Sequence, residues 1–433
     1  MAALSGDEVR RLRARAQGLH GPGGRSVADA VRLAAGLQAQ DAKACRLQVR
    51  ARSHGLTASD VDAACAARPP AVVRTWLMRG TLHAVAAADV HWLTALLGPR
   101  AAAQCRGRRA RLGLDEDLCT RALAALERIL PGRALQRDAL VARLAEEGVA
   151  LDPRSQAPAH LLLYAAARGV VCRGPEAGAD ATTYVLAEEW LDGVAGPELS
   201  GDEALAELAV RHAASYGPVA AEDLARWSGL PLGQARRAQS AAGARLTTVT
   251  GPSGPLLTAP DAAAGAPTGE VRLTGHFDPY LLGYRDRDLM LPPAFAARIA
   301  TGGGFLMPCV LRDGAVVGTW RRADARGAAV AGRGTRPSAE APRRKTDHEE
   351  PRADARGAAV AGRGTRPSAE APRRKTDHEG HKVDRPGGAG IVVRVELFGG
   401  ERDRALADGI DGEVADIGRF LGVDADWEWA SGL

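Results

Sequence analysis

The hydrophobic positions of residues 1–98 first recur at the spacing of amphipathic helices and then alternate as in short strands. Ser26 and Thr57 each precede a helical segment, where a hydroxyl side chain can cap the helix. Residues 72–78 and 81–85 then have the pattern of a β-hairpin. Helices followed by a β-hairpin are the plan of a winged helix, a relative of the helix-turn-helix.

The same order of elements recurs along the chain. Residues 99–196 give three amphipathic helical segments and two strands, and residues 197–250 give three helical segments and one strand. Residues 221–238 of the third unit have the pattern of a helix-turn-helix, with its turn at residues 228–230. One such helical triplet by itself favours a core that does not touch DNA, whereas three in tandem favour DNA-binding modules.

Gly, Pro, Ala and Thr dominate residues 251–270, which predicts a linker. Residues 271–433 then carry β-patterned runs and a final helical segment, with Asp313-Gly314 as a hairpin turn. The expected strands lie within residues 271–284, 305–311, 315–320 and 391–398, and the expected helix within 401–422. The predicted fold class is α+β, with tandem winged-helix modules followed by a small β-rich C-terminal domain.

A perfect duplication interrupts this last domain, because residues 322–349 recur unchanged as residues 352–379. The copies have few large apolar groups and many Pro, Gly and charged residues, so residues 322–379 are predicted to be a disordered insert. Together they hold fourteen basic and eight acidic residues, so they contribute +6 to the net charge of +5 and the remainder carries −1. A DNA-binding face must therefore come from the placement of arginines rather than from bulk charge.

The composition excludes several classes of protein. The six cysteines include no Cys-x-x-Cys pair, so neither a zinc site nor a disulfide framework is expected. No signal-peptide pattern begins the sequence, and no uninterrupted apolar stretch reaches the ~18 residues of a membrane span. Nucleotide-binding and metalloprotease motifs are also absent from the sequence. We expect a cytoplasmic protein without a metal or other cofactor and without membrane contact.

Five strings stand out once the modules are in place. They are GLQAQD at 36–41, TWLMRGTLHAV at 75–85, HFDPYLLGYRDRD at 276–288, DGAVVGTW at 313–320 and RVELF at 394–398. Together and in this order they resemble the AlkZ-like winged-helix family, of which some members are DNA glycosylases. The resemblance covers essentially the whole chain except the duplicated insert.

The resemblance implies three winged-helix units and a β domain that form a concave DNA-binding surface. In glycosylase members a Gln-x-Gln or Gln-x-Asp pair lies at the catalytic centre, and the matching residues here are Gln38 and Gln40. The family includes proteins that protect producers of DNA-alkylating natural products and others that unhook interstrand crosslinks. Without the family, such a glutamine pair would be expected only to cap or pair with nearby backbone.

Glutamine cannot abstract a proton, but its carbonyl oxygen can hold a water molecule beside a sugar that develops positive charge. A purine alkylated at N7 or N3 is cationic and leaves readily, so the pair suits cationic adducts and not neutral lesions such as uracil. A bifunctional enzyme would need a lysine nucleophile, and Lys43 lies near the pair. We interpret Lys43 instead as a surface or phosphate-contacting residue, which predicts a monofunctional enzyme that leaves an abasic site.

Other residues are weaker candidates for contact with DNA. Arg74 and Arg79 flank the first hairpin as candidate phosphate contacts, and His83 is more readily explained as a structural histidine. The motif that opens the C-terminal domain adds charged and imidazole side chains that contact either DNA or one another. The full set of DNA-binding candidates is Lys43, Arg74, Arg79, His83, His276, Asp278, Arg285 and Arg287.

The predicted partner is double-stranded DNA bearing alkylated purines, bound by a monomer. The alternative is a non-catalytic winged-helix regulator or damage-binding protein, which would tolerate substitution of Gln38 and Gln40 and prefer a sequence or a dimeric site. A third possibility is a family member that binds DNA but has lost activity because of the insert.

Overall fold

The structure is a computed structural model that describes residues 3–178, 181–260, 262, 268–302, 304–324, 390–400 and 402–430. The chain divides into two units, residues 1–342 with 389–433 and residues 343–388, and every described residue belongs to the first. Within the described residues, no helix combines the length and apolarity that a membrane crossing requires.

One order of elements (helix, strand, helix, helix, strand, strand) occurs twice in the first half of the chain. The first copy consists of α2 (Val27–Leu33), β1 (Leu37–Gln38), α3 (Ala42–Arg50), α4 (Ala58–Ala66), β2 (Val72–Trp76) and β3 (Leu82–Ala86). The second consists of α7 (Glu116–Ile129), β4 (Leu135–Gln136), α8 (Arg137–Glu146), α9 (Ala157–Ala167), β5 (Val171–Arg173) and β6 (Thr183–Leu186). The predicted caps are present, since Ser26 and Thr57 each form a capping box at the start of α2 and α4.

The strands of the two copies form one antiparallel sheet in the order β1-β3-β2-β5-β6-β4, joined where Arg74 of β2 pairs with Arg173 of β5. Side chains alternate between the faces of a sheet, so Val73 and Val85 enter one hydrophobic core whereas Val72 and Ala84 enter another. The sheet therefore separates two cores. Two helices between the copies, α5 (Val90–Gln104) and α6 (Arg106–Arg111), were not among the predicted elements.

The third unit consists of α11 (Gly201–Tyr216), α12 (Ala221–Ser228) and α13 (Leu232–Ala242), and α1 (Gly6–Ala16) from the start of the chain packs on α11. Gly229 adopts a φ of 84° and ends α12 at the predicted turn. The hairpin of β7 (Thr247–Gly251) and β8 (Gly254–Thr258) follows. The prediction that a linker starts at residue 251 is therefore wrong, because a Gly- and Pro-rich turn hid a second strand that pairs with β7.

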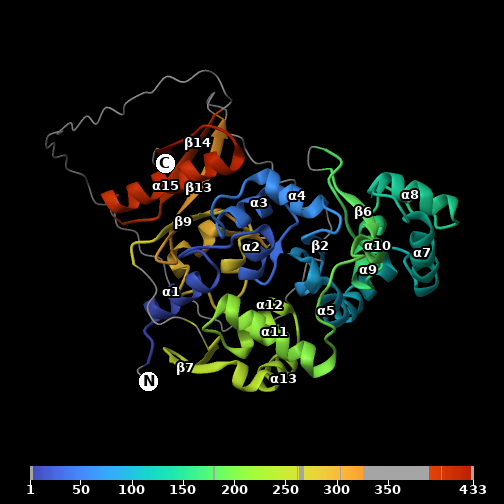
Figure 1. Ribbon diagram of the computed structural model, residues 1–433, viewed down its shortest axis with the longest axis horizontal. Helices are drawn as coiled ribbons and strands as arrows, with labels where there is room; N and C mark the ends of the chain where they lie inside the picture. The colour runs from blue at the N-terminus through green and yellow to red at the C-terminus, as the bar shows by residue number, and fades with distance from the viewer. Residues whose placement is uncertain are drawn as a thin grey trace, which may run out of the picture. The chain divides into compact units, whose positions relative to one another are not determined.

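The C-terminal part is a five-stranded sheet in the order β15-β14-β13-β12-β9, on which α15 (Arg404–Leu421) packs through Ile410, Val414 and Ile417 (Figure 1). Its strands are β9 (Val271–Thr274), β12 (Cys309–Arg312), β13 (Ala315–Asp324), β14 (Ile391–Leu397) and β15 (Ala425–Trp429). The predicted Asp313-Gly314 turn joins β12 to β13, and both of its residues have positive φ.

Three predictions about this part need correction. The β-run at residues 271–284 is a strand only through Thr274, because a turn and short helical segments follow. The final strand β15, parallel to β14, was not predicted. The insert does not begin at residue 322, since residues 322–324 continue the ladder of β13 with β14; residues 325–379 of the predicted insert lie outside the described residues.

Three buried histidines make the stability of the native state depend on pH. Burial lowers the pKa of His20 to about 4, and that of His83 and of His212 to about 3. The native state therefore keeps them neutral, whereas the unfolded chain protonates them near pH 6.5. Their contribution to stability is complete above pH 6.5 and is lost as the pH falls from there toward 4 to 3.

We expect the free energy of unfolding to decrease as the pH falls below 6.5, by up to about 1.4 kcal/mol per pH unit for each histidine. Urea denaturation at several pH values between 7 and 5 measures this slope. His212→Phe is the matched variant, because phenylalanine can keep the ring contacts with Tyr216 and Trp227 but cannot titrate. Its slope is expected to be smaller, and a slope equal to that of the unaltered chain would contradict the assignment.

Candidate active site

The two glutamines lie on a short segment that is fixed at both ends. Gln38 belongs to β1 and pairs with His83 of β3, and the backbone N–H of Ala39 donates to the carbonyl oxygen of Leu82 at 2.9 Å. At the other end, the carboxylate of Asp41 caps α3 by accepting a bond from the backbone N–H of Ala44 at 2.9 Å. The backbone between β1 and α3 therefore holds the two glutamines in fixed positions.

The side chains of the pair meet each other rather than the backbone. Nε2 of Gln38 donates to Oε1 of Gln40 at 2.6 Å, with Gln38 9% exposed and Gln40 half-buried. Among the described residues, neither Oε1 of Gln38 nor Nε2 of Gln40 has a protein hydrogen-bond partner. The pair therefore keeps one acceptor and one donor for a ligand or a water molecule.

A third glutamine, which the sequence analysis did not single out, supports this segment from behind. Gln48 of α3 is fully buried, and its Nε2 donates to the carbonyl oxygens of Gln38 at 3.3 Å and His276 at 3.1 Å. The side-chain amide of Gln48 thus joins the backbone of Gln38 to that of His276, which lies 228 residues after Gln48 in the sequence. The available sequence signal was a polar residue between the buried Cys45 and Val49 on the core face of a helix.

His276 and its neighbours form the side of the site contributed by the C-terminal part. Nδ1 of His276 bonds the carbonyl oxygen of Leu306 at 3.1 Å, and its ring lies 5.1 Å from that of Phe305. Burial lowers the pKa of His276, which favours the neutral imidazole. The ring of Phe277 lies 4.8 Å from that of Phe305. The half-buried rings of His276, Phe277 and Phe305 therefore cluster where Gln48 bonds the backbone of His276.

Three of the candidates for DNA contact, Arg74, His83 and Asp278, are buried in the structure. Arg74 is ion-paired with Glu176 inside the protein, and Asp278 accepts two bonds from Arg52 at 2.7 and 2.9 Å. His83 is 2% exposed and bonds the carbonyl oxygen of Thr81 through its ring. Their hydrogen-bonding groups already have partners inside the protein, so we expect these side chains to stabilise the fold rather than to contact DNA.

The remaining candidates occupy different environments. Lys43 and Arg285 are exposed, and Arg79 is half-buried and donates to the carbonyl oxygen of Trp227. Burial, and next the neighbouring Arg226, lowers the pKa of the half-buried Arg287. Contact of Lys43, Arg79, Arg285, Arg287 and His276 with DNA stays a prediction. No group of three or more His, Cys, Asp or Glu side chains among the described residues could hold a metal ion.

Comparison with known proteins now identifies the family. The family described as DNA glycosylase AlkZ-like matches residues 31–349, which include the glutamine pair. The chain belongs to this AlkZ-like family. The predicted resemblance is thereby confirmed, and so is the enzyme class: this family member is a DNA glycosylase, a DNA-repair enzyme that hydrolyses the N-glycosidic bond.

Two similar proteins extend the comparison. The interstrand DNA cross-link repair glycosylase of Streptomyces sahachiroi is 29% identical over 310 residues, which cover 69% of this chain and 83% of that protein. The solved structure of Streptomyces sahachiroi DNA glycosylase AlkZ matches with a TM-score of 0.72 and 22% identity, over 99% of this chain and 100% of that chain. This match confirms the mixed helix-and-sheet fold of the AlkZ-like enzyme described here.

Proposed function

We propose that this AlkZ-like enzyme is a monofunctional DNA glycosylase that releases cationic N7- or N3-alkylated purines and leaves an abasic site. The observation that carries the proposal is the amide pair of Gln38 and Gln40, joined at 2.6 Å and open on one acceptor and one donor. Bulky adducts and crosslinks belong to the same substrate class when they are attached through N7 of guanine. The name of the Streptomyces sahachiroi relative supports their inclusion.

The chemistry follows from what an amide can and cannot do. When the N-glycosidic bond breaks, its electron pair neutralises the cationic purine and the anomeric carbon acquires oxocarbenium character. Water then adds to that carbon and releases its proton to solvent, because neither glutamine can accept one. Oε1 of Gln38 can accept a hydrogen bond from that water and place partial negative charge near the sugar. Neutral bases lack the charge that makes the purine leave.

The repeated order of elements supports the assignment of three winged-helix modules. We propose modules at residues 1–98, 99–196 and 197–258, the last extended to the end of β8, with a linker after it and a β-rich domain from residue 271. Together they form a surface for double-stranded DNA, which a monomer binds. In the first module the catalytic segment is β1 and the residues that follow it, between α2 and α3, so the scaffold of the module itself holds the pair.

The experiment that tests the proposed function compares two lesions in one duplex sequence. Purified enzyme is incubated with duplexes that contain either 7-methylguanine or uracil, and the released base is quantified. We expect release of 7-methylguanine, no release of uracil, and strand cleavage only after alkali. Equal release of both bases would contradict a mechanism that depends on a cationic purine, and strand cleavage without alkali would contradict a monofunctional enzyme.

Gln48→Met is expected to lower the release rate at saturating DNA by about tenfold while leaving DNA affinity unchanged. Methionine keeps the length of the side chain but loses the donor that holds the Gln38 and His276 carbonyl oxygens, at a cost of about 1–3 kcal/mol. Single-turnover release and DNA titration measure the two quantities. Gln17→Met is the control, because Gln17 is also fully buried but accepts a bond from Arg52 instead. Equal release rates in the two variants would contradict a positioning role for Gln48.

A further inference from the structure

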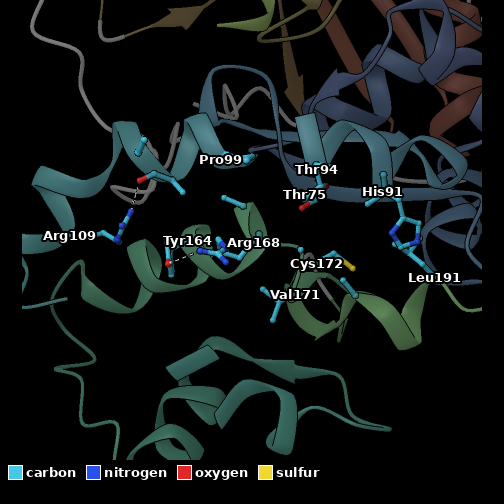
Figure 2. A pocket seen from close by; sticks show the side chains of 18 of the residues that line it. Thr75, His91, Thr94, Pro99, Arg109, Tyr164, Arg168, Val171, Cys172 and Leu191 are labelled. Carbon is cyan, nitrogen blue, oxygen red and sulfur yellow. Dashed lines mark hydrogen bonds between the residues drawn. The ribbon is translucent and has the colours of Figure 1, made fainter. Parts of the chain in front are cut away.

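A cleft of about 500 Å³ lies between α5 and the C-terminal end of α9, and it does not include the glutamine pair. Figure 2 shows Arg109, Tyr164 and Arg168 near one another on one side, with His91 and Leu191 at the far side. Arg106 completes the charged side. Apolar side chains line much of the rest, so the charge of the cleft is concentrated at one end.

Arg109 is held in place before any ligand arrives. The residue is 3% exposed, its Nη1 donates to the carbonyl oxygen of Ala102 at 2.6 Å, and its guanidinium lies 4.1 Å from the ring centre of Tyr164. Its Nε has no hydrogen-bond partner among the described residues. A buried donor without a partner costs about 1–3 kcal/mol, so a ligand oxygen that accepts from it would recover that energy.

The charges of the cleft do not cancel. Among the described residues that line it, Glu116 is the only acidic one, and it lies 3.5 Å from both Arg106 and Arg109. Arg168 is exposed, and within the described part of the chain it donates only to the neutral hydroxyl of Tyr164, at 3.4 Å. Three guanidinium groups therefore face one carboxylate, which favours an anion. Arginine is suited to phosphate because its donors match two phosphate oxygens at once.

The sheet relates this cleft to the glutamine pair. Thr75 of the cleft lining pairs with His83, and His83 pairs with Gln38, so the three residues form one row across β2, β3 and β1. Directly paired residues of antiparallel strands point to the same face, and neighbouring strands lie about 4.8 Å apart. Thr75 of the cleft lining therefore lies roughly 10 Å from Gln38, on the same face of the sheet. Arg109, Tyr164 and Arg168 line the other end of the cleft (Figure 2).

We propose that this cleft binds a backbone phosphate of the DNA through Arg106, Arg109 and Arg168. The inference rests on the proposed function, since it assumes that DNA lies over the glutamine pair. A phosphate contact carries no sequence information, but it fixes the register of the duplex. The cleft therefore contributes to binding and positioning, whereas bond cleavage takes place at the glutamine pair.

The test is the double variant Arg106→Ala/Arg168→Ala, because both side chains are exposed and their loss leaves the core intact. The dissociation constant for a duplex with one 7-methylguanine is measured at several NaCl concentrations, together with the release rate at saturating DNA. We expect about tenfold weaker binding, a salt slope smaller by about 1–2, and a lower release rate, because the phosphate contact also fixes the register of the duplex. The control is Arg128→Ala/Arg143→Ala, two arginines whose side chains are 58% and 55% exposed on α7 and α8.

The outcomes separate the two proposals. Wild-type affinity and salt slope in the Arg106→Ala/Arg168→Ala variant would overturn the assignment of the cleft, and so would an equal loss of affinity in the control. Binding of inorganic phosphate at the cleft without any effect on DNA affinity would assign the cleft to a free anion and would also overturn the proposal. Absence of base release by the unaltered enzyme would instead overturn the proposed function.

Discussion

Replacement of Gln38 or Gln40 by alanine is expected to lower the single-turnover release of 7-methylguanine by about 100-fold or more. Loss of one preorganised polar group at a site of developing charge typically costs a factor of about 10²–10³ in rate. Each substitution also removes the bond between the two amides, which join at 2.6 Å, so the partner loses its orientation. Because the two act as a unit, the double variant is expected to be little slower than either single variant.

The second repeat supplies a matched control for this experiment. Gln136 ends β4 as Gln38 ends β1, each directly after a leucine, but Gln136 is exposed and belongs to the other copy. Gln136→Ala is therefore expected to release the base at the wild-type rate. DNA binding should be retained in all of these variants, as measured by titration. Normal release by both Gln38→Ala and Gln40→Ala would remove the amide pair from the mechanism.

Glu413→Ala is expected to lower the free energy of unfolding by about 3–5 kcal/mol, the typical cost of breaking a buried ion pair. Glu413 of α15 is 7% exposed and bonds Arg50 at 2.8 Å and Arg272 at 2.9 Å. It also accepts the backbone N–H of Leu273 at 2.7 Å. Alanine would leave the buried Arg272 without its carboxylate, and among the described residues Arg50 would keep only the carboxylate of Asp416, at 3.4 Å. Urea denaturation, followed by circular dichroism, measures the loss.

An exposed ion pair between β14 and β15 of the C-terminal sheet shows the effect on stability that a surface pair would have. Glu428 bonds Arg394 at 2.6 Å, but its side chain is 52% exposed. Glu428→Ala should therefore change stability by no more than about 1 kcal/mol. A Glu413→Ala chain as stable as the Glu428→Ala chain would show that the buried cluster contributes no more than a surface pair. Because Arg50 lies on α3, we also expect Glu413→Ala to disturb the segment that holds Gln38.

The buried cluster of Arg50, Arg272 and Glu413 explains why the C-terminal part matters for a site whose proposed catalytic residues are Gln38 and Gln40. Arg50 of α3 is joined to Glu413 of α15, and Gln48 of the same helix reaches the backbone of His276. Both contacts cross more than 220 residues of sequence. The C-terminal sheet and its helix therefore support α3, which in turn supports the strand that carries Gln38.

Local signals in the sequence predicted a large part of this fold. Ser26 and Thr57 cap their helices, Gly229 ends α12, and Asp313-Gly314 turns between two strands. Each of these signals acts within a few residues, through a hydrogen bond to the next turn or through a positive φ. The family was likewise indicated by short strings, but by five of them together and in order rather than by the one that contains the glutamine pair.

Tertiary structure decided which polar residues remain available to a ligand. Arg74 looked like a surface arginine until Glu176, about 100 residues away, paired with it in the interior. Nothing in the sequence near Gln48 indicates that it bonds the backbone of His276. Residues 425–429 form β15 only because they pair in parallel with β14. Periodicity and capping are properties of neighbouring residues, so the sequence by itself determined most of the elements and their order and predicted the role of the pair. Burial and ion pairing depend on segments that meet only after folding, so the tertiary structure alone decided the support of the site and the charge of the cleft.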